Sequence, residues 1–210
     1  MYIPDAFREA DQAVLHQLIR DNSFATLIAH SGGALFASHL PLLLDSARGD
    51  CGTLRGHMAR ANPHWRGFKD GAEALAIFQG PHAYISPSWY ETHPSVPTWN
   101  YVAVHAYGIP RLIEDRAELR SLLRASVRLY ESGFEKPWEF DLPEGFAEKM
   151  INMIVGFEIP IGRLEGKLKL NQNRSAADRR SVIRVLERSP DPVARAIAEL
   201  MAARTPPAGE

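Results

Sequence analysis

Residues 97–108 read P-T-W-N-Y-V-A-V-H-A-Y-G, and this stretch decides the fold class of the chain. Successive side chains of a β-strand point to opposite faces, so Val102 and Val104 share one face while Tyr101 and Tyr107 share the other. A strand with one solvated face would carry small polar residues there, whereas this second face carries aromatic rings and an imidazole. The stretch therefore predicts a strand covered on both faces, by a helix, a second subunit or a flat ligand.

Shorter strand-like segments precede this strand, and turn signals separate them. Ser31-Gly32-Gly33 lies between the first two segments, which favours a β-hairpin. Gly80-Pro81 predicts an interruption between the last two segments. Five or more short strands in succession are typical of an antiparallel barrel. The expected strands are 24–30, 34–44, 53–59, 74–79 and 83–85.

Helical patterns lie before and after these strands. An apolar stripe predicts a short amphipathic helix over 11–20. Asp115 and Glu118 have the spacing of a capping box, which predicts a helix that ends near Gly133. Ser175 and Asp191 are helix-capping residues ahead of two further apolar stripes. The sequence thus predicts an α+β protein, mainly β: an antiparallel barrel completed by a last strand or hairpin over 157–170, with a helix over 146–154, other peripheral helices and C-terminal helices.

Composition predicts a globular protein of the reducing cytoplasm. A formal net charge of -1 favours no general attraction to nucleic acid or to an anionic membrane. No apolar run approaches the ~20 residues of a membrane helix, and we expect no secretory leader. The single cysteine, Cys51, cannot form an internal disulfide. No cysteine or histidine cluster has zinc-ligand spacing, so we expect no metal site.

The charge balance changes along the chain. From Arg163 onward there are ten Lys or Arg against six Asp or Glu, a net of +4, whereas the first 162 residues carry fourteen against nineteen, a net of -5. Such a change marks a candidate boundary. We expect a barrel domain over 1–170, a helical appendage over 171–204 and a disordered tail over 205–210.

Four blocks of sequence resemble the PaiB family, bacterial proteins described as FMN-binding negative transcriptional regulators. The blocks are G-H-M-A-R-A-N-P-H-W (56–65), Y-I-S-P-S-W-Y (84–90), the stretch 97–108 and E-G-K-L-K-L-N-Q-N (165–173), in the order of the family. The resemblance covers roughly residues 1–186. It implies the FMN-binding split barrel, the fold of pyridoxamine phosphate oxidases, and an intimate homodimer.

The resemblance also implies which strands contact FMN, whose parts are a phosphate, a ribityl chain and a flat ring. The second and third strands of such barrels supply phosphate and ring contacts, and here they hold Ser38, His39, His57 and Arg60. Arg60 is the best phosphate candidate because its fork matches phosphate oxygens, the alternative being a solvated arginine at a strand end. His57 could bond the phosphate or ribityl group, or serve the structure alone. Ser38 and His39 lie in an otherwise apolar strand, so at least one of them should be hydrogen-bonded.

A second group of candidates lies later in the chain. Trp99, Asn100 and Tyr101 could border the ring from the neighbouring subunit, or could stabilise the dimer alone. Lys169 and Gln172 could close the phosphate side together with Lys167, because lysines two apart on a strand point the same way. The alternative for this segment is a solvated basic strand. No catalytic residue emerges from the sequence.

Two classes of function remain open. A regulator is favoured by Arg180, Arg184 and Arg188, whose spacing places them on one helical stripe that could contact DNA phosphates. A flavin-dependent oxidoreductase is favoured by the open aromatic loop 89–99. A haem-binding split barrel, with His39, His57 or His93 as the axial ligand, is a minor alternative to FMN.

Overall fold

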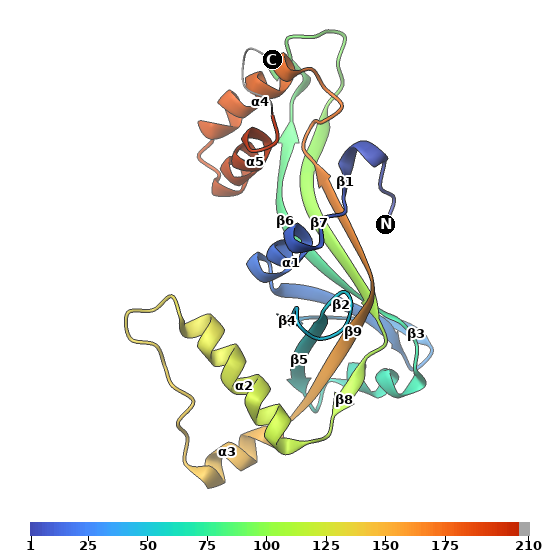
Figure 1. The fold of residues 1–210 in the computed structure, drawn as a ribbon, viewed down its shortest axis with the longest axis vertical. Helices are drawn as coiled ribbons and strands as arrows, with labels where there is room; N and C mark the ends of the chain where they lie inside the picture. Colours follow the sequence, from blue (N-terminus) through green and yellow to red (C-terminus); the bar gives the residue numbers. More distant parts are fainter. Residues whose placement is uncertain (206–210) are drawn as a thin grey trace. The chain divides into compact units, whose positions relative to one another are not determined.

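The computed structural model describes residues 1–205 and shows a mixed α+β protein built on an antiparallel sheet (Figure 1). The sheet order is β3-β2-β6-β7-β9-β5-β4, and β1 and β8 also pair with β9. The strands are β1 (Arg8–Glu9), β2 (Phe24–Ser31), β3 (Ala34–Pro41), β4 (Leu43–Asp45), β5 (Thr53–Ala59), β6 (Ala74–Ile85), β7 (Thr98–Gly108), β8 (Arg111–Ile113) and β9 (Ile154–Lys169). The predicted fold class is confirmed.

Helices lie between and after the strands. The α-helices are α1 (Gln12–Asp21), α2 (Arg116–Glu131), α3 (Glu144–Ile151), α4 (Ala176–Glu187) and α5 (Pro192–Ala202). Three short 3₁₀ helices are η1 (Asp5–Phe7), η2 (Pro63–Asp70) and η3 (Pro87–Trp89). Within the described part of the chain, every helix is too short or too polar to span a membrane.

The chain divides into two compact units. Unit 1 contains Met1–Asp21, Gln79–Val104 and the chain from Glu165, and unit 2 contains Asn22–Phe78 and His105–Leu164. The predicted appendage 171–204 holds α4 and α5, which belong to unit 1. The boundaries expected from sequence stay a prediction, and the expected tail lies, apart from Thr205, outside the described residues.

The hairpin that opens unit 2 follows from its turn residues. Gly32 and Gly33 have φ angles of 62° and 81°, the left-handed region that a two-residue hairpin turn requires at both positions. They connect β2 and β3, with Ser31 paired to Ala34. The segment 34–44, expected as one strand, is instead divided at Leu42. The Leu42 side chain is fully buried, and its N–H donates to the carbonyl of Ser23 (2.9 Å), the residue that precedes β2.

The expected interruption at Gly80-Pro81 is wrong, because β6 runs through both residues. Proline has no N–H, so it interrupts a strand only at a position whose N–H would hydrogen-bond to a neighbouring strand. At Gly80 an added Cβ would lie 3.1 Å from Val102 Cβ, so the glycine allows close packing against β7. The predicted turn is thus a position of close strand packing within one long strand.

Unit 1 has its own core, formed by strand ends and the C-terminal helix pair. Buried residues of β6, β7 and β9 pack with those of α4 and α5, including Val102, Val182, Ile197 and Met201. Both helices begin as expected: the Ser175 side chain accepts from Asp178 N, and that of Asp191 accepts from Val193 N.

Unit 2 carries the insertion of α2 and α3. Asp115 caps α2 as predicted by accepting from Glu118 N (2.7 Å). Arg120 of α2 pairs with Glu144 and Glu148 of α3, each at 2.5 Å. The helix expected over 146–154 is α3, which ends at Ile151 because residues from Ile154 onward join the long strand β9.

Candidate functional site

An open pocket of about 530 Å³ lies in unit 2 between β3 and β5. It holds three of the four candidates that sequence placed on these strands, Ser38, His39 and His57. The remaining lining residues are small, apolar or amide-bearing: Phe36, Ala37, Leu40, Met58, Ala59, Asn62 and Pro63. The structure thus joins residues from two strands and a following turn into one concave surface.

A hydrogen-bond network fixes the polar edge of this pocket. Asn62 Nδ2 donates to Ser38 Oγ (3.0 Å), and His64 Nδ1 lies 2.9 Å from the same oxygen. His64 is fully buried, with its ring 5.0 Å from that of Phe36 and 5.4 Å from that of Phe68. Because Ser38 Oγ already accepts from Asn62, its hydroxyl proton is free to bond Nδ1 of a neutral His64. Ser38 is therefore oriented from behind by two side chains.

Burial favours the neutral form of the His57 and His64 imidazoles. Desolvation lowers the pKa of His57 and that of His64 below the usual 6.5. A neutral imidazole offers one donor and one acceptor and no charge. His39 is exposed, and its Nδ1 lies 3.0 Å from Thr26 Oγ1 of the neighbouring strand. The pocket accordingly presents hydroxyl, amide and imidazole groups suited to hydrogen-bonding a polar heterocycle or a polyol.

Arg60, the fourth candidate on these strands, is held by the backbone. Its Nε donates to Asn152 O and its Nη2 to Ile154 O, both at 2.8 Å. Trp65 Nε1 in turn donates to the Arg60 carbonyl (3.0 Å). Two of the guanidinium nitrogens that could bind a phosphate are thus already hydrogen-bonded to backbone carbonyls. These bonds connect the end of β5 to the chain that follows α3. The role of Arg60 toward phosphate stays a prediction, and this placement does not favour it.

The aromatic candidates of β7 lie in unit 1. Trp99 is 54% exposed, and its ring meets that of Tyr84 edge-on at 5.8 Å. Asn100 is fully buried, and its Nδ2 donates to Met201 Sδ (3.4 Å). Tyr101 is half-buried, with Lys167 Nζ 5.2 Å from its ring centre. Of the three, Trp99 and Tyr101 are accessible, whereas the Asn100 amide is turned into the core.

The last two candidates also lie in unit 1, at the end of β9. Lys169 Nζ donates to Thr98 Oγ1 of β7. Gln172 folds back on its own strand, where its Oε1 accepts from Leu170 N and its Nε2 donates to Leu168 O. Lys169 thus keeps ammonium protons free for a ligand, while the Gln172 amide is engaged in a local turn.

Sequence reasoning missed Asn62 and His64. Both lie in the block G-H-M-A-R-A-N-P-H-W, where Asn62 before a proline caps η2 by accepting from His64 N (3.0 Å). That turn signal was visible in the sequence. The approach of both side chains to Ser38, more than 20 positions earlier, was not.

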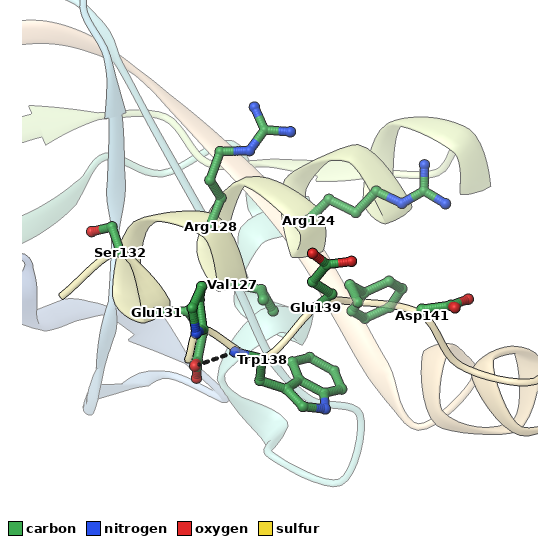
Figure 2. A pocket seen from close by; sticks show the side chains of 10 residues that line it. Arg124, Val127, Arg128, Glu131, Ser132, Trp138, Glu139 and Asp141 are labelled. Carbon is green, nitrogen blue, oxygen red and sulfur yellow. Dashed lines mark hydrogen bonds between the residues drawn. The ribbon is translucent and has the colours of Figure 1, made fainter. Parts of the chain in front are cut away.

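Another cavity, of about 440 Å³, lies in the helical insertion of unit 2. Figure 2 shows Val127 of α2 facing Trp138 of the following loop, with Arg124 and Arg128 along the helix. Trp138 N donates to Glu131 (2.8 Å), which fastens this loop to α2. None of the predicted site residues lines this cavity.

Comparisons with known proteins show the class of protein to which this fold belongs. The family described as "Putative FMN-binding domain" matches residues 1–163. The flavocytochrome Anf3 of Azotobacter vinelandii is 17% identical, with a TM-score of 0.62 over 77% of this chain and 69% of its own. A FAD and haem binding protein of Mycobacterium smegmatis is 18% identical, with a TM-score of 0.60 over 77% and 73% of the two chains. The class is therefore the flavin-binding split barrel.

A relative in sequence narrows this class further. "Protease synthase and sporulation protein PAI 2" of Bacillus subtilis (strain 168) is 39% identical over 202 residues, which cover 96% of each chain. The chain belongs to the PaiB family of FMN-binding split-barrel proteins.

Proposed function

We propose that this protein binds FMN, with the pocket between β3 and β5 holding the flavin. The observation that carries the proposal is the Ser38 hydroxyl fixed by Asn62 and His64 at the edge of an open pocket with apolar walls. Preorganised polar groups of this kind orient a ligand without paying for their own ordering at the time of binding. The family match supports a flavin as the ligand.

The donor set of the pocket fits the uncharged parts of FMN. Ser38, His39, His57 and Asn62 supply hydrogen-bonding groups, while Phe36 and Met58 supply apolar contact. A bound flavin would supply hydride or electron transfer chemistry. The chain's own contribution is to orient the ligand and to exclude water from one of its faces.

Flavin titration of the purified protein tests this proposal. We expect FMN to bind with quenched fluorescence, and Ser38→Ala to weaken binding about tenfold, the usual effect of losing one oriented hydrogen bond. Ser86→Ala is the matched control, because Ser86 lies in unit 1 and caps η3. Absence of flavin binding by the wild-type protein, or an equal loss in both variants, would contradict the proposal. An absorption spectrum of the same sample separates flavin from haem.

We further propose a homodimeric transcriptional regulator as the cellular role. The exposed Trp99 and Tyr84 on unit 1 support a dimer, since exposed aromatic residues are the common anchors of interfaces. Arg180 and Arg188 have no ion-pair partner among the described residues, which supports contact with phosphates. A flavin-dependent oxidoreductase is the alternative, and oxidation of a reduced nicotinamide by the FMN-loaded protein would favour it.

A further inference from the structure

Two lysines lie together on one face of β9 in unit 1, and neither ammonium is paired with a carboxylate of the described residues. Lys167 is 7% exposed, and its Nζ donates to Tyr2 O (3.0 Å). Lys169 is half-buried and donates to Thr98 Oγ1. Each ammonium has three N–H groups and a single hydrogen bond to the described residues, so donors remain on both.

The surroundings do not neutralise these two charges. The carboxylate of Glu165, on the same face of β9, pairs with the terminal ammonium of Met1 at 2.5 Å. Tyr2 and Tyr101 contribute ring faces 5.4 and 5.2 Å from Lys167 Nζ, a cation–π contact that carries no negative charge. The cluster of Met1, Glu165, Lys167 and Lys169 therefore bears a net charge of about +2.

Such an arrangement is costly without an anion. Burial lowers the pKa of Lys169, and the neighbouring Lys167 charge lowers it further against the opposing effect of Tyr101. Removing like charges from water without a counter-charge destabilises the folded chain. A bound anion would supply the counter-charge and accept the free N–H groups, while the Thr98 and Tyr101 hydroxyls offer further donors nearby.

We propose that Lys167 and Lys169, with Thr98 and Tyr101, form an anion site of unit 1 that binds a phosphate group. A phosphate group accepts several hydrogen bonds at once, which matches two ammonium and two hydroxyl donors. The group can belong to inorganic phosphate or to a phosphate monoester such as FMN. The proposal does not depend on flavin binding by the pocket of unit 2.

Titration of the full-length protein with inorganic phosphate tests the site. The side-chain NMR signals of Lys167 and Lys169 are followed, with sodium chloride at matched ionic strength as the reference. We expect saturable shifts with phosphate and none with chloride. Lys169→Gln should weaken phosphate binding about tenfold or more, as expected for one charge-assisted hydrogen bond. Lys149→Gln, an exposed lysine of α3 in unit 2, should leave it unchanged.

The outcomes separate this site from the flavin pocket. Phosphate shifts that do not saturate in the wild-type protein, or equal losses in both variants, would overturn the proposal. The wild-type titration decides even where Lys169→Gln fails to fold. Saturable shifts of the same lysine signals with FMN but not with riboflavin identify a phosphate monoester as a ligand of this site. Shifts with inorganic phosphate alone identify a free anion.

Discussion

The Asp178 carboxylate on α4 accepts hydrogen bonds from the backbone N–H groups of Glu91 (2.8 Å) and Thr92 (3.0 Å), more than 80 residues earlier in the chain. Asp178 is 2% exposed and lies at the start of α4, where the helix dipole favours a negative charge. Arg174, just before α4, reaches the same loop through Ser95 Oγ (3.2 Å) and stacks over Tyr90. The aromatic loop is therefore held by the C-terminal helix segment of unit 1.

Replacing Asp178 by Asn should lower the free energy of unfolding by about 1–3 kcal/mol at neutral pH, because charge-assisted hydrogen bonds to the loop weaken. Burial by itself raises the pKa of Asp178, but the bonds from Thr92, Glu91 and Ser175 outweigh it and hold the pKa below 3.8. A group with a depressed folded pKa stabilises the protein above its unfolded pKa and loses that effect as pH falls through the folded value. Urea unfolding at several pH values measures the difference between the two proteins.

The Asp178→Asn deficit should therefore shrink below about pH 4. Asp70→Asn, at the exposed end of η2, serves as a control that should change stability by less than about 0.5 kcal/mol. A deficit that does not vary with pH would show that the charge of Asp178 is not responsible.

Stability should also depend on pH through His57 and His64. Burial lowers both folded pKa values below 6.5, so the unfolded chain binds more protons in the window just below that pH. Stability should consequently fall as pH decreases from about 7 to about 5.5, before most carboxylates titrate. Denaturant midpoints across this window measure the slope, and His57→Gln should reduce it. His30→Gln, at an exposed position near the end of β2, should leave the slope unchanged.

Gly67 of η2 should tolerate no side chain. A Cβ built there would lie 1.9 Å from the backbone oxygen of His30, which forces η2 away from β2. Gly67→Ala should lower the free energy of unfolding by about 1–3 kcal/mol, the usual cost of overpacking. At Gly133 no atom lies within 4 Å of an added Cβ, so Gly133→Ala should be neutral or slightly stabilising. Thermal unfolding of the two variants compares them, and equal midpoints would be inconsistent with the tight approach.

If the protein is the proposed homodimer, light scattering at low micromolar concentration should give a molecular mass of about twice 23.4 kDa, the mass of one chain. Truncating Trp99 to Ala should weaken self-association, by ~2 kcal/mol if its ring is a central anchor of the interface. Trp138→Ala removes a ring of similar exposure, 48% against 54%, from the insertion of unit 2 and should leave the mass unchanged. A monomeric wild-type protein would rule out the proposed dimer.

DNA binding, if it uses α4, should depend strongly on salt. Replacing Arg180, Arg184 and Arg188 by Ala should flatten the log–log salt dependence by roughly 2–3 units, since each neutralised phosphate contributes about 0.9. Arg184 Nη2 lies 3.6 Å from Glu91 Oε1, so Arg184 should contribute least to the salt dependence. Mobility-shift assays across a range of salt concentrations measure the slope. The charge-matched control replaces the exposed Arg8, Arg66 and Arg111, and an equal effect there would remove α4 as the contact.

Some residues of the candidate site could be predicted from the sequence, whereas their contacts with residues far away in the chain could not. Ser38, His39 and His57 were expected in one site because the family resemblance assigns ligand contacts to the two strands that carry them, and the pocket contains all three. Asn62 was visible only as a turn residue, since its bond to Ser38 joins positions 24 apart. Arg60 was the best phosphate candidate, with a solvated arginine as the alternative. Instead, its guanidinium donates hydrogen bonds to two backbone carbonyls more than 90 residues later in the chain.

The sequence alone determined where most of the strands lie, the hairpin turn and the capped helices, because alternation, glycine conformation and capping are properties of residues a few positions apart. It also identified the family, since four short blocks occur in the expected order. Only the tertiary structure decided that Asn100 is buried against Met201, that His64 supports Ser38, and that Lys167 and Lys169 bond to a carbonyl and a hydroxyl rather than to a carboxylate. These outcomes depend on desolvation and on the geometry of groups far apart in the chain, which no local pattern encodes.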